Sequence, residues 1–287
     1  MLDAVALSDS LTQRYGVHVI GQARTDADGL RAEFRPADVA HTRGFSVTVL
    51  VGWRTVEVDF VPATYGRQLL HAMALADRGQ RSVFNTFIQA AVNAGAHVTF
   101  QINGQNTSTS ESDIWPTDWR SLTFGFSKGP MTIDGSNPQV LHALALEWTS
   151  RMMGCVLSLM HLEAVEHGNR GEAEGTAHQA LITRYERSTL NRQACMAFHG
   201  RTCKVCGFDF HKVYGPIGEG YIEVHHVESL ARLAPGTVLN PVIDLVPLCS
   251  NCHSMAHKRS PLPYSVEELK AMILAAAGLA TSHSDCP

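Results

Sequence analysis

The sequence predicts an α+β protein with two domains. Its 287 residues are enough for two domains of ordinary size. In some segments apolar and polar residues alternate, as in strands, and in others apolar residues recur every three or four positions, as in helices. The stretch over 166–175, EHGNRGEAEG, has three glycines and no large apolar residue, which is typical of a linker. We therefore expect domains over 1–165 and 176–278, with a flexible tail over 279–287.

Strands and helices are mixed in the first domain. Val47, Val49 and Val51 alternate with other residues up to Gly52-Trp53, and the alternation resumes at Val56, which predicts a β-hairpin over 45–60. Apolar spacing predicts helices over 4–15, 65–76, 81–94 and 138–165, strands over 18–22, 98–102 and 122–126, and a polar loop over 105–118.

The charge of the chain excludes a broadly basic nucleic-acid-binding surface. The net charge is −4, and residues 176–287 hold ten Lys and Arg against nine Asp and Glu. Residues 1–175 hold thirteen against eighteen. Any phosphate-binding surface must therefore be a local patch.

The sequence favours a cytoplasmic protein. The N-terminus, Met1-Leu2-Asp3, lacks the basic start of a secretory signal. The most apolar run, over 140–165, is interrupted by Glu147 and Arg151, so we expect no membrane span.

Four of the seven cysteines form two CxxC pairs, Cys203/Cys206 and Cys249/Cys252. Four thiolates suit tetrahedral zinc in a closed structural site, and such a module would lose much of its fold without the metal. The alternative is that they are unpaired core thiols, but two CxxC pairs in a cytoplasmic chain favour a metal. Cys155, Cys195 and Cys286 are interpreted as ordinary small residues.

A group of histidines follows the first CxxC pair. A short strand ends in His225-His226, and a second strand over 243–248 enters the second pair. His253 and His257 are four residues apart on a helix, hence on one face. Neutral imidazoles from a helix and a strand form an open metal site, where water and phosphate can fill the vacant positions.

Together these residues resemble an HNH, or ββα-metal, nuclease with a four-cysteine zinc, over about a third of the chain. The resemblance implies a C-terminal HNH domain with a structural zinc that cuts DNA. Within this family, the sequence more narrowly resembles the bacterial McrA-like HNH endonucleases, which are modification-dependent restriction enzymes. That narrower resemblance rests on Arg184-Tyr185-Glu186-Arg187, His199-Gly200, the segment from Cys203 to Phe210, and Ile222 to His226. Residues 1–165 resemble no family.

The resemblance implies a role for each residue of the site. His226 corresponds to the general base, and His225, His253 and His257 correspond to ligands of the catalytic ion. Asp244 stands where the family usually has the middle Asn of its name, and it is the second catalytic residue. A carboxylate there can accept a proton from His226 and should raise the pKa of that histidine.

The implied cofactors are a structural Zn²⁺ and a catalytic divalent ion such as Mg²⁺, Mn²⁺, Co²⁺ or Ni²⁺. Arg184, Arg187, Arg192 and Arg201 are candidates for holding DNA phosphates, and the alternative is a solvated helix face paired with Glu186. Glu223 is interpreted either as an extra contact of the site or as a solvated or Arg-paired strand residue.

The first domain occupies the place of a specificity domain. Trp53, Trp115 and Trp119 are candidates for base recognition, because a flipped base needs stacking surfaces beside polar groups. The alternative is that these tryptophans belong to the core.

We therefore expect a metal-dependent DNA endonuclease with an N-terminal reader domain, active in restriction or phage defence on DNA with modified cytosine. One alternative is a DNA- or protein-binding factor with a degenerate HNH module, and another is a homing or toxin nuclease. One active site per chain and two strands to cut suggest a homodimer.

Overall fold

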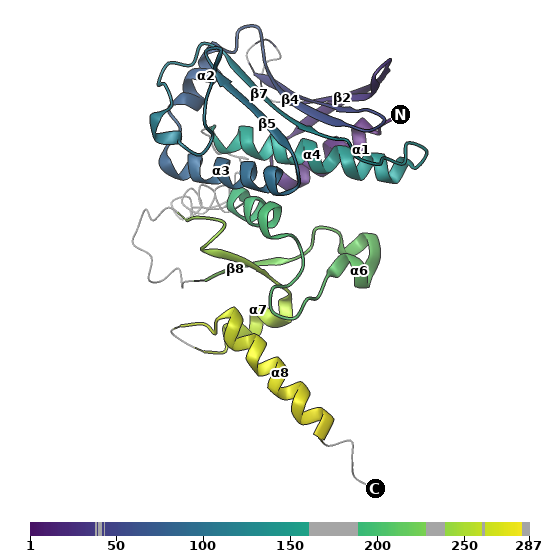
Figure 1. Cartoon of the computed structure of the whole chain (residues 1–287), viewed down its shortest axis with the longest axis vertical. Coiled ribbons are helices and arrows are strands. Elements are labelled where there is room, and N and C mark those ends of the chain that lie inside the picture. The colour runs from purple at the N-terminus through teal and green to yellow at the C-terminus, as the bar shows by residue number, and fades with distance from the viewer. Residues whose placement is uncertain are drawn as a thin grey trace, which may run out of the picture. The chain divides into compact units, whose positions relative to one another are not determined.

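The computed structural model describes residues 1–160 (except 38, 40, 41 and 43), 189–227, 239–259 and 262–282. The chain divides into two compact units, Met1–Ala194 and Cys195–Pro287 (Figure 1). The predicted linker over 166–175 lies outside the described residues. Within the described ranges, no helix is both long enough and apolar enough to cross a membrane.

The first unit contains a seven-stranded antiparallel sheet in the order β1-β2-β3-β4-β7-β5-β6. The predicted hairpin is confirmed as β3 and β4, in which Val49 pairs with Val58. The strands are β1 (Val19–Asp26), β2 (Gly29–Pro36), β3 (Phe45–Val51), β4 (Val56–Pro62), β5 (His97–Ile102), β6 (Gln105–Asn106) and β7 (Leu122–Lys128).

Three helices cover one face of this sheet (Figure 1). Alternate strand residues are buried on that face, which is why the valines of β3 and β4 line the core. Gly154 lets α4 (Pro138–Ser158) approach α3 (Arg78–Asn93) closely, because a Cβ at Gly154 would lie 2.4 Å from the ring of Phe87 in α3. The helices of this unit are α1 (Ala4–Tyr15), α2 (Arg67–Ala74), α3 (Arg78–Asn93), α4 (Pro138–Ser158) and the short η1 (Ser112–Ile114).

Two features of the first unit differ from the sequence prediction. Strand β2 was not predicted, although Arg31, Glu33 and Arg35 alternate with three buried residues, as in a strand with one buried face. Helix α4 ends at Ser158, short of the predicted end at Val165. After it, the Met160 carbonyl accepts a hydrogen bond from the Gln80 side chain (2.9 Å).

The second unit has the ββα arrangement that the sequence predicted. β8 and β9 pair antiparallel with His225 opposite Val246, and α7 follows β9 directly. A small core surrounds the cysteines and includes Val205, Leu248 and Leu269. Residues 189–199 form a helix, and the later elements are α6 (Phe210–Tyr214), η2 (Gly215–Gly218), β8 (Glu223–His226), β9 (Leu245–Leu248), α7 (Ser250–Ala256) and α8 (Val266–Ser282).

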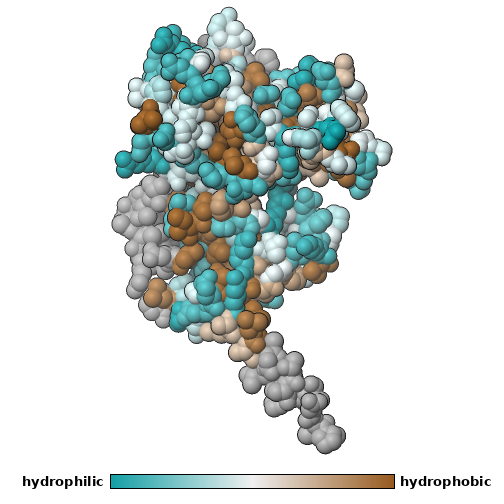
Figure 2. Space-filling view, viewed as in Figure 1, coloured by the Kyte–Doolittle hydropathy of each residue, from teal (hydrophilic) through white to brown (hydrophobic). Residues whose placement is uncertain are grey.

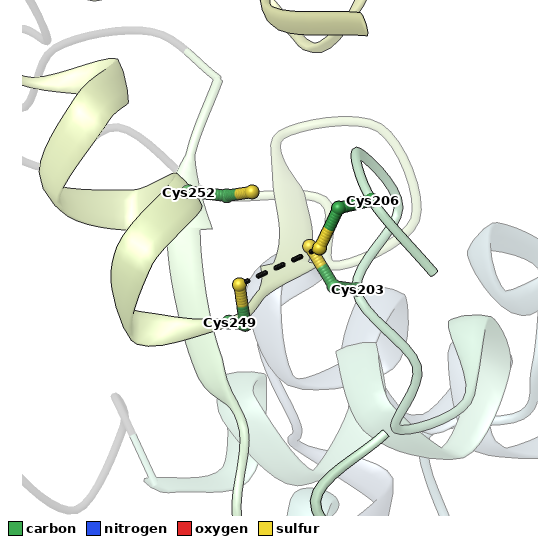
Figure 3. A group of neighbouring side chains, drawn as sticks. All are labelled: Cys203, Cys206, Cys249 and Cys252. Carbon is green, nitrogen blue, oxygen red and sulfur yellow. Dashed lines mark hydrogen bonds between the residues drawn. The ribbon is translucent and has the colours of Figure 1, made fainter. Parts of the chain in front are cut away.

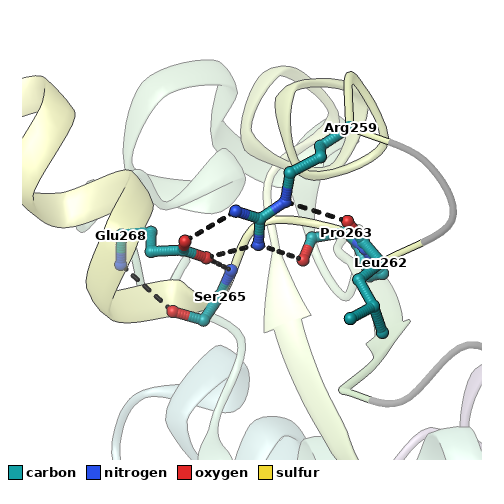
Figure 4. A network of polar contacts seen from close by, with 5 residues as sticks. All are labelled: Arg259, Leu262, Pro263, Ser265 and Glu268. Carbon is teal, nitrogen blue, oxygen red and sulfur yellow. Dashed lines mark hydrogen bonds and ion pairs between the residues drawn. The ribbon is translucent and has the colours of Figure 1, made fainter.

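A polar network fixes the start of α8 (Figure 4). The Glu268 N–H donates to the Ser265 hydroxyl (3.1 Å), and the Ser265 N–H donates to the Glu268 carboxylate (2.7 Å), so the two residues form a capping box. The Arg259 guanidinium donates twice to Glu268, at 2.8 Å each, and also to the carbonyls of Leu262 and Pro263.

Candidate functional site

The four predicted zinc cysteines come together from two segments (Figure 3). Cys203 and Cys206 lie on a tight turn, where Gly207 (φ 76°) donates its N–H to the Cys203 carbonyl (2.9 Å). A left-handed residue at this position favours glycine. Cys249 is the N-cap of α7, and Cys252 lies in its first turn.

The spacing of the four sulfurs fits zinc. All four Sγ atoms lie within 4.8 Å of one another, and those of Cys206 and Cys249 are 3.7 Å apart. Four bonds of about 2.3 Å in a tetrahedron put neighbouring sulfurs about 3.8 Å apart. The donors present therefore match a closed zinc site with four thiolate ligands.

The thiols of this cluster need a cation in order to ionise together. Burial raises the pKa of Cys203, but backbone N–H groups, including those of Cys206 and Cys249, bring it down overall to about 7. Burial, and secondarily the neighbouring sulfurs, raise the pKa of Cys252. Bound zinc would stabilise all four thiolates, as it does in structural sites.

Three of the four predicted active-site histidines form a second cluster. His225 comes from β8, His253 from α7, and His257 from the residue that ends α7. Their ring centroids are 4.8 Å apart for His225–His257, 4.9 Å for His253–His257 and 5.2 Å for His225–His253. One nitrogen from each ring lies within 4.8 Å of the others, so the three can share one ion.

The state of His225 fits a metal ligand. Its side chain is buried, and its Nδ1 has no hydrogen-bond partner among the described residues. A buried polar atom without a partner is costly unless something else satisfies it. Burial, reinforced by the charges of His253, His257 and His226, lowers the pKa of His225 to about 4. The imidazole is therefore neutral at neutral pH, as a metal ligand must be.

Glu223 contacts this cluster directly. Its Oε2 lies 2.5 Å from Nδ1 of His253. Of the two interpretations of Glu223, the structure supports the extra contact and not the solvated or Arg-paired residue. The sequence could have placed Glu223 near this site, because Glu223 and His225 are two residues apart on β8 and therefore lie on the same face of the strand. A carboxylate on one ring nitrogen leaves Nε2 of His253 for an ion.

His226 is half-buried and lies outside the three-histidine cluster. Burial lowers its pKa and the nearby His253 lowers it further, whereas Asp244 acts weakly in the opposite direction. Asp244 thus raises the pKa of His226, as expected, but burial and His253 outweigh it and the pKa is lowered overall. A neutral His226 can accept a proton at neutral pH.

Asp244 organises the loop before β9. Its carboxylate accepts the N–H of Asn240 (2.7 Å), and its carbonyl accepts the N–H of Val227 (2.9 Å), the residue after His226. Asn240 had not been singled out, although an Asn-Pro pair beside the site is a turn signal. In the contact with the Asn240 N–H the Asp244 side chain acts only as an acceptor, and an Asn side chain also has an acceptor oxygen.

The four arginines proposed for DNA contact do not form one described group. Arg184 and Arg187 lie outside the described residues. Arg192 is half-buried in the helix over 189–199, and Arg201 is half-buried just before the first CxxC pair.

The structure separates the three candidate tryptophans. Trp115 is 4% exposed and Trp119 is fully buried, and their indole N–H groups donate to the carbonyls of Ser108 and Pro116 (both 2.8 Å). Both rings pack against Phe100 in the core, so neither has a free face for a base, and we correct that expectation. Trp53, at the β3–β4 turn, is 82% exposed.

Comparison with known proteins adds one finding. Residues 203–259 match the family model of the HNH endonucleases, so the C-terminal unit contains an HNH domain, a nuclease domain of that type. The match includes the four clustered cysteines and the four histidines that the sequence predicted for the active site. No curated protein and no solved structure matches the chain.

Proposed function

We propose that this HNH domain hydrolyses DNA phosphodiester bonds, with one divalent ion held by His225, His253 and His257. The observation that carries the proposal is the convergence of these three imidazoles on one point. The site leaves coordination positions for water and phosphate, because His257 is exposed and His253 only half-buried.

His226, Glu223 and Asp244 would have different roles in the in-line attack of water on the phosphodiester. A ring nitrogen of His226 takes a proton from the attacking water, whose oxygen bonds to phosphorus as the bond to the 3′ oxygen breaks. A divalent ion held by the three histidines of the cluster would supply positive charge that offsets the charge developing on the phosphate. The leaving 3′ oxygen takes up a proton from solvent. Glu223 orients His253 through Nδ1, and Asp244 fixes the loop that follows β8. The products carry 5′-phosphate and 3′-hydroxyl ends.

A plasmid assay tests this function. Purified protein with Mg²⁺, Mn²⁺, Co²⁺ or Ni²⁺ should nick supercoiled DNA, and His226→Ala should lower the rate by about 10²–10⁴-fold. His211→Ala is the matched control, because His211 is an exposed histidine on α6 outside the cluster. If no ion supports cleavage of any DNA, the domain acts as a binding module and the nuclease proposal is wrong.

We further propose that the first unit reads modified cytosine and that the protein is a McrA-like restriction or phage-defence enzyme of the cytoplasm. Trp53 supports a reader, since it is exposed on a closed turn and the Arg54 guanidinium lies 5.3 Å from its ring centroid. The Gly52 N–H donates to the Thr55 carbonyl (2.9 Å), which holds the turn. Exposed aromatic rings of this kind stack on bases.

Matched DNAs test the reader. Substrates with cytosine, 5-methylcytosine, 5-hydroxymethylcytosine or phosphorothioate links should be cut at different rates, and Trp53→Ala should reduce that difference. Ile114→Ala removes another exposed apolar side chain of the first unit and is the control. Equal cutting of all four DNAs would reject the reader and leave the nuclease proposal intact.

A further inference from the structure

Helix α8 exposes apolar side chains that the described residues of its own unit leave uncovered. From Val266 to Ala276, Leu269 is the only buried residue. Beyond it Met272 is 47% exposed, Ile273 44% and Leu274 73%. In Figure 1 α8 extends away from α7 and β8, and Figure 2 shows hydrophobic residues at the described end of the helix.

These residues continue a stripe that begins in the core. Met272, Ile273 and Ala276 follow Leu269 at three, four and seven positions, so they share its face of the helix. We call Met272, Ile273 and Ala276 the α8 stripe. Its spacing is that of a seam between two packed helices.

The direction of α8 is fixed by its first turn. The Arg259–Glu268 pair and the Ser265 cap hold that turn (Figure 4). The Arg259 guanidinium also lies 4.3 Å from the ring centroid of Tyr264. Arg259 follows α7 closely, and α7 carries His253 and His257. A partner bound to α8 would therefore be held at a set distance from the metal-binding histidines.

We infer that the α8 stripe is the contact through which two copies of this chain form a symmetric dimer. Between Lys270 and Ser282 the sequence has no charged side chain, so two copies of the stripe meet without like-charge repulsion. From Met272 to Ser282 the helix is about 16 Å long. A helix pair of that length buries less than the roughly 1,200–2,000 Å² of a stable interface, so the dimer is weak and depends on protein concentration.

A second copy also fits the reaction, and this step rests on the proposed function. One HNH site cuts one strand, whereas the strands of a duplex run in opposite directions around a twofold axis. A symmetric pair of chains presents two sites related in the same way. The dimer would convert a nick into a double-strand break.

Sedimentation velocity on the full chain tests the contact without DNA or catalytic ion. Across the micromolar range, the mass should rise from the 31.3 kDa of one chain toward twice that value. Met272→Glu with Ile273→Glu should weaken self-association by about tenfold or more. Ile217→Glu changes an apolar residue that is 89% exposed on η2 of the same unit, and should leave self-association unchanged.

Two results would overturn the inference: a single-chain mass at every concentration, or a dimer that the stripe variant does not weaken. Circular dichroism of the stripe variant shows whether it is folded. If the dimer forms but no DNA is cut, the nuclease proposal fails and the contact stands. If the protein both dimerises and cuts DNA, the stripe variant should still nick plasmid but linearise it more slowly than the wild type.

Discussion

The cysteine and histidine clusters share one short helix but differ in surroundings. Cys249 and Cys252 lie at the start of α7, and His253 and His257 lie on the same helix or at its end. Three of the four cysteines are buried in the core of the second unit, whereas among the three histidines only His225 is buried. The same helix thus contributes to a closed site, which suits a structural ion, and to an open site, which suits catalysis.

The difference between the two clusters also indicates that the histidine site depends on the fold around the cysteines. The core of the second unit is small and built around the cysteines. A core of that size needs an additional source of stability, and a structural metal ion can provide it. The histidines need that fold in order to converge, and we expect the fold not to depend on the exposed His257.

Removing zinc should have the largest effect. Structural zinc contributes about 10–16 kcal/mol to small metal-dependent folds. Chelation, or Cys252→Ser, should therefore unfold residues 195–287 and leave the first unit folded, which limited proteolysis with mass spectrometry would detect. Cys155→Ser, at a cysteine buried in α4, is the control that should keep the second unit resistant. A second unit that resists protease unchanged in excess chelator would remove the distinction between the clusters.

His257→Ala should abolish cleavage without unfolding the protein. The variant removes one of three ligands from the open site, but His257 is exposed, so the change in stability should stay within about 0.5 kcal/mol. Plasmid cleavage and thermal unfolding, measured on one preparation, test the loss of activity and the unchanged stability. Unfolding at a clearly lower temperature would mean that the histidines also support the fold.

Glu223→Gln should have a smaller effect, confined to the open site. Loss of a carboxylate behind a ligand histidine costs about 10–100-fold in metal affinity. Cleavage should fall at low Mn²⁺ and recover at high Mn²⁺, as a titration of rate against ion concentration would show. The exposed Glu219→Gln is the control. A rate that stays low at saturating Mn²⁺ would instead place Glu223 in the chemical step.

Substitution of Asp244 should distinguish loop support from charge. Asp244→Asn keeps an acceptor for the Asn240 N–H and should keep most of the activity. Asp244→Ala leaves that N–H without its partner and should lower stability by about 1 kcal/mol, with a parallel loss of rate. Chemical denaturation and cleavage of the two variants make the measurement. Equal losses in both would mean that the carboxylate charge matters beyond the loop.

In the second unit the sequence predicted which cysteines and which three histidines come together, but not all of the contacts around them. The CxxC pairs and the spacing of His253 and His257 are short-range patterns, and short-range geometry follows from helix and turn periodicity. The contact between Glu223 and His253 joins a strand to a helix and depends on how they pack. The net pKa of His226 depends on burial, which no local pattern specifies.

In the first unit the pattern predicted strands and helices but not which aromatic residues face solvent. Trp115 and Trp119 lie in a polar stretch, yet they pack into the core through Phe100. Trp53 follows a buried valine strand, yet it is exposed, because the hairpin turns there. Strand β2 was missed although its charged residues alternate with buried ones, which is the pattern of a strand with one buried face.

Counting bound ions tests the central claim most directly. Zinc-loaded protein should bind one further Mn²⁺ per chain, measured from the electron paramagnetic resonance signal of free Mn²⁺, and His257→Ala should lose this ion while keeping its zinc. Absence of a second bound ion in the wild type, or an unchanged Mn²⁺ count in His257→Ala, would contradict the assignment of the two clusters to two ions with separate roles.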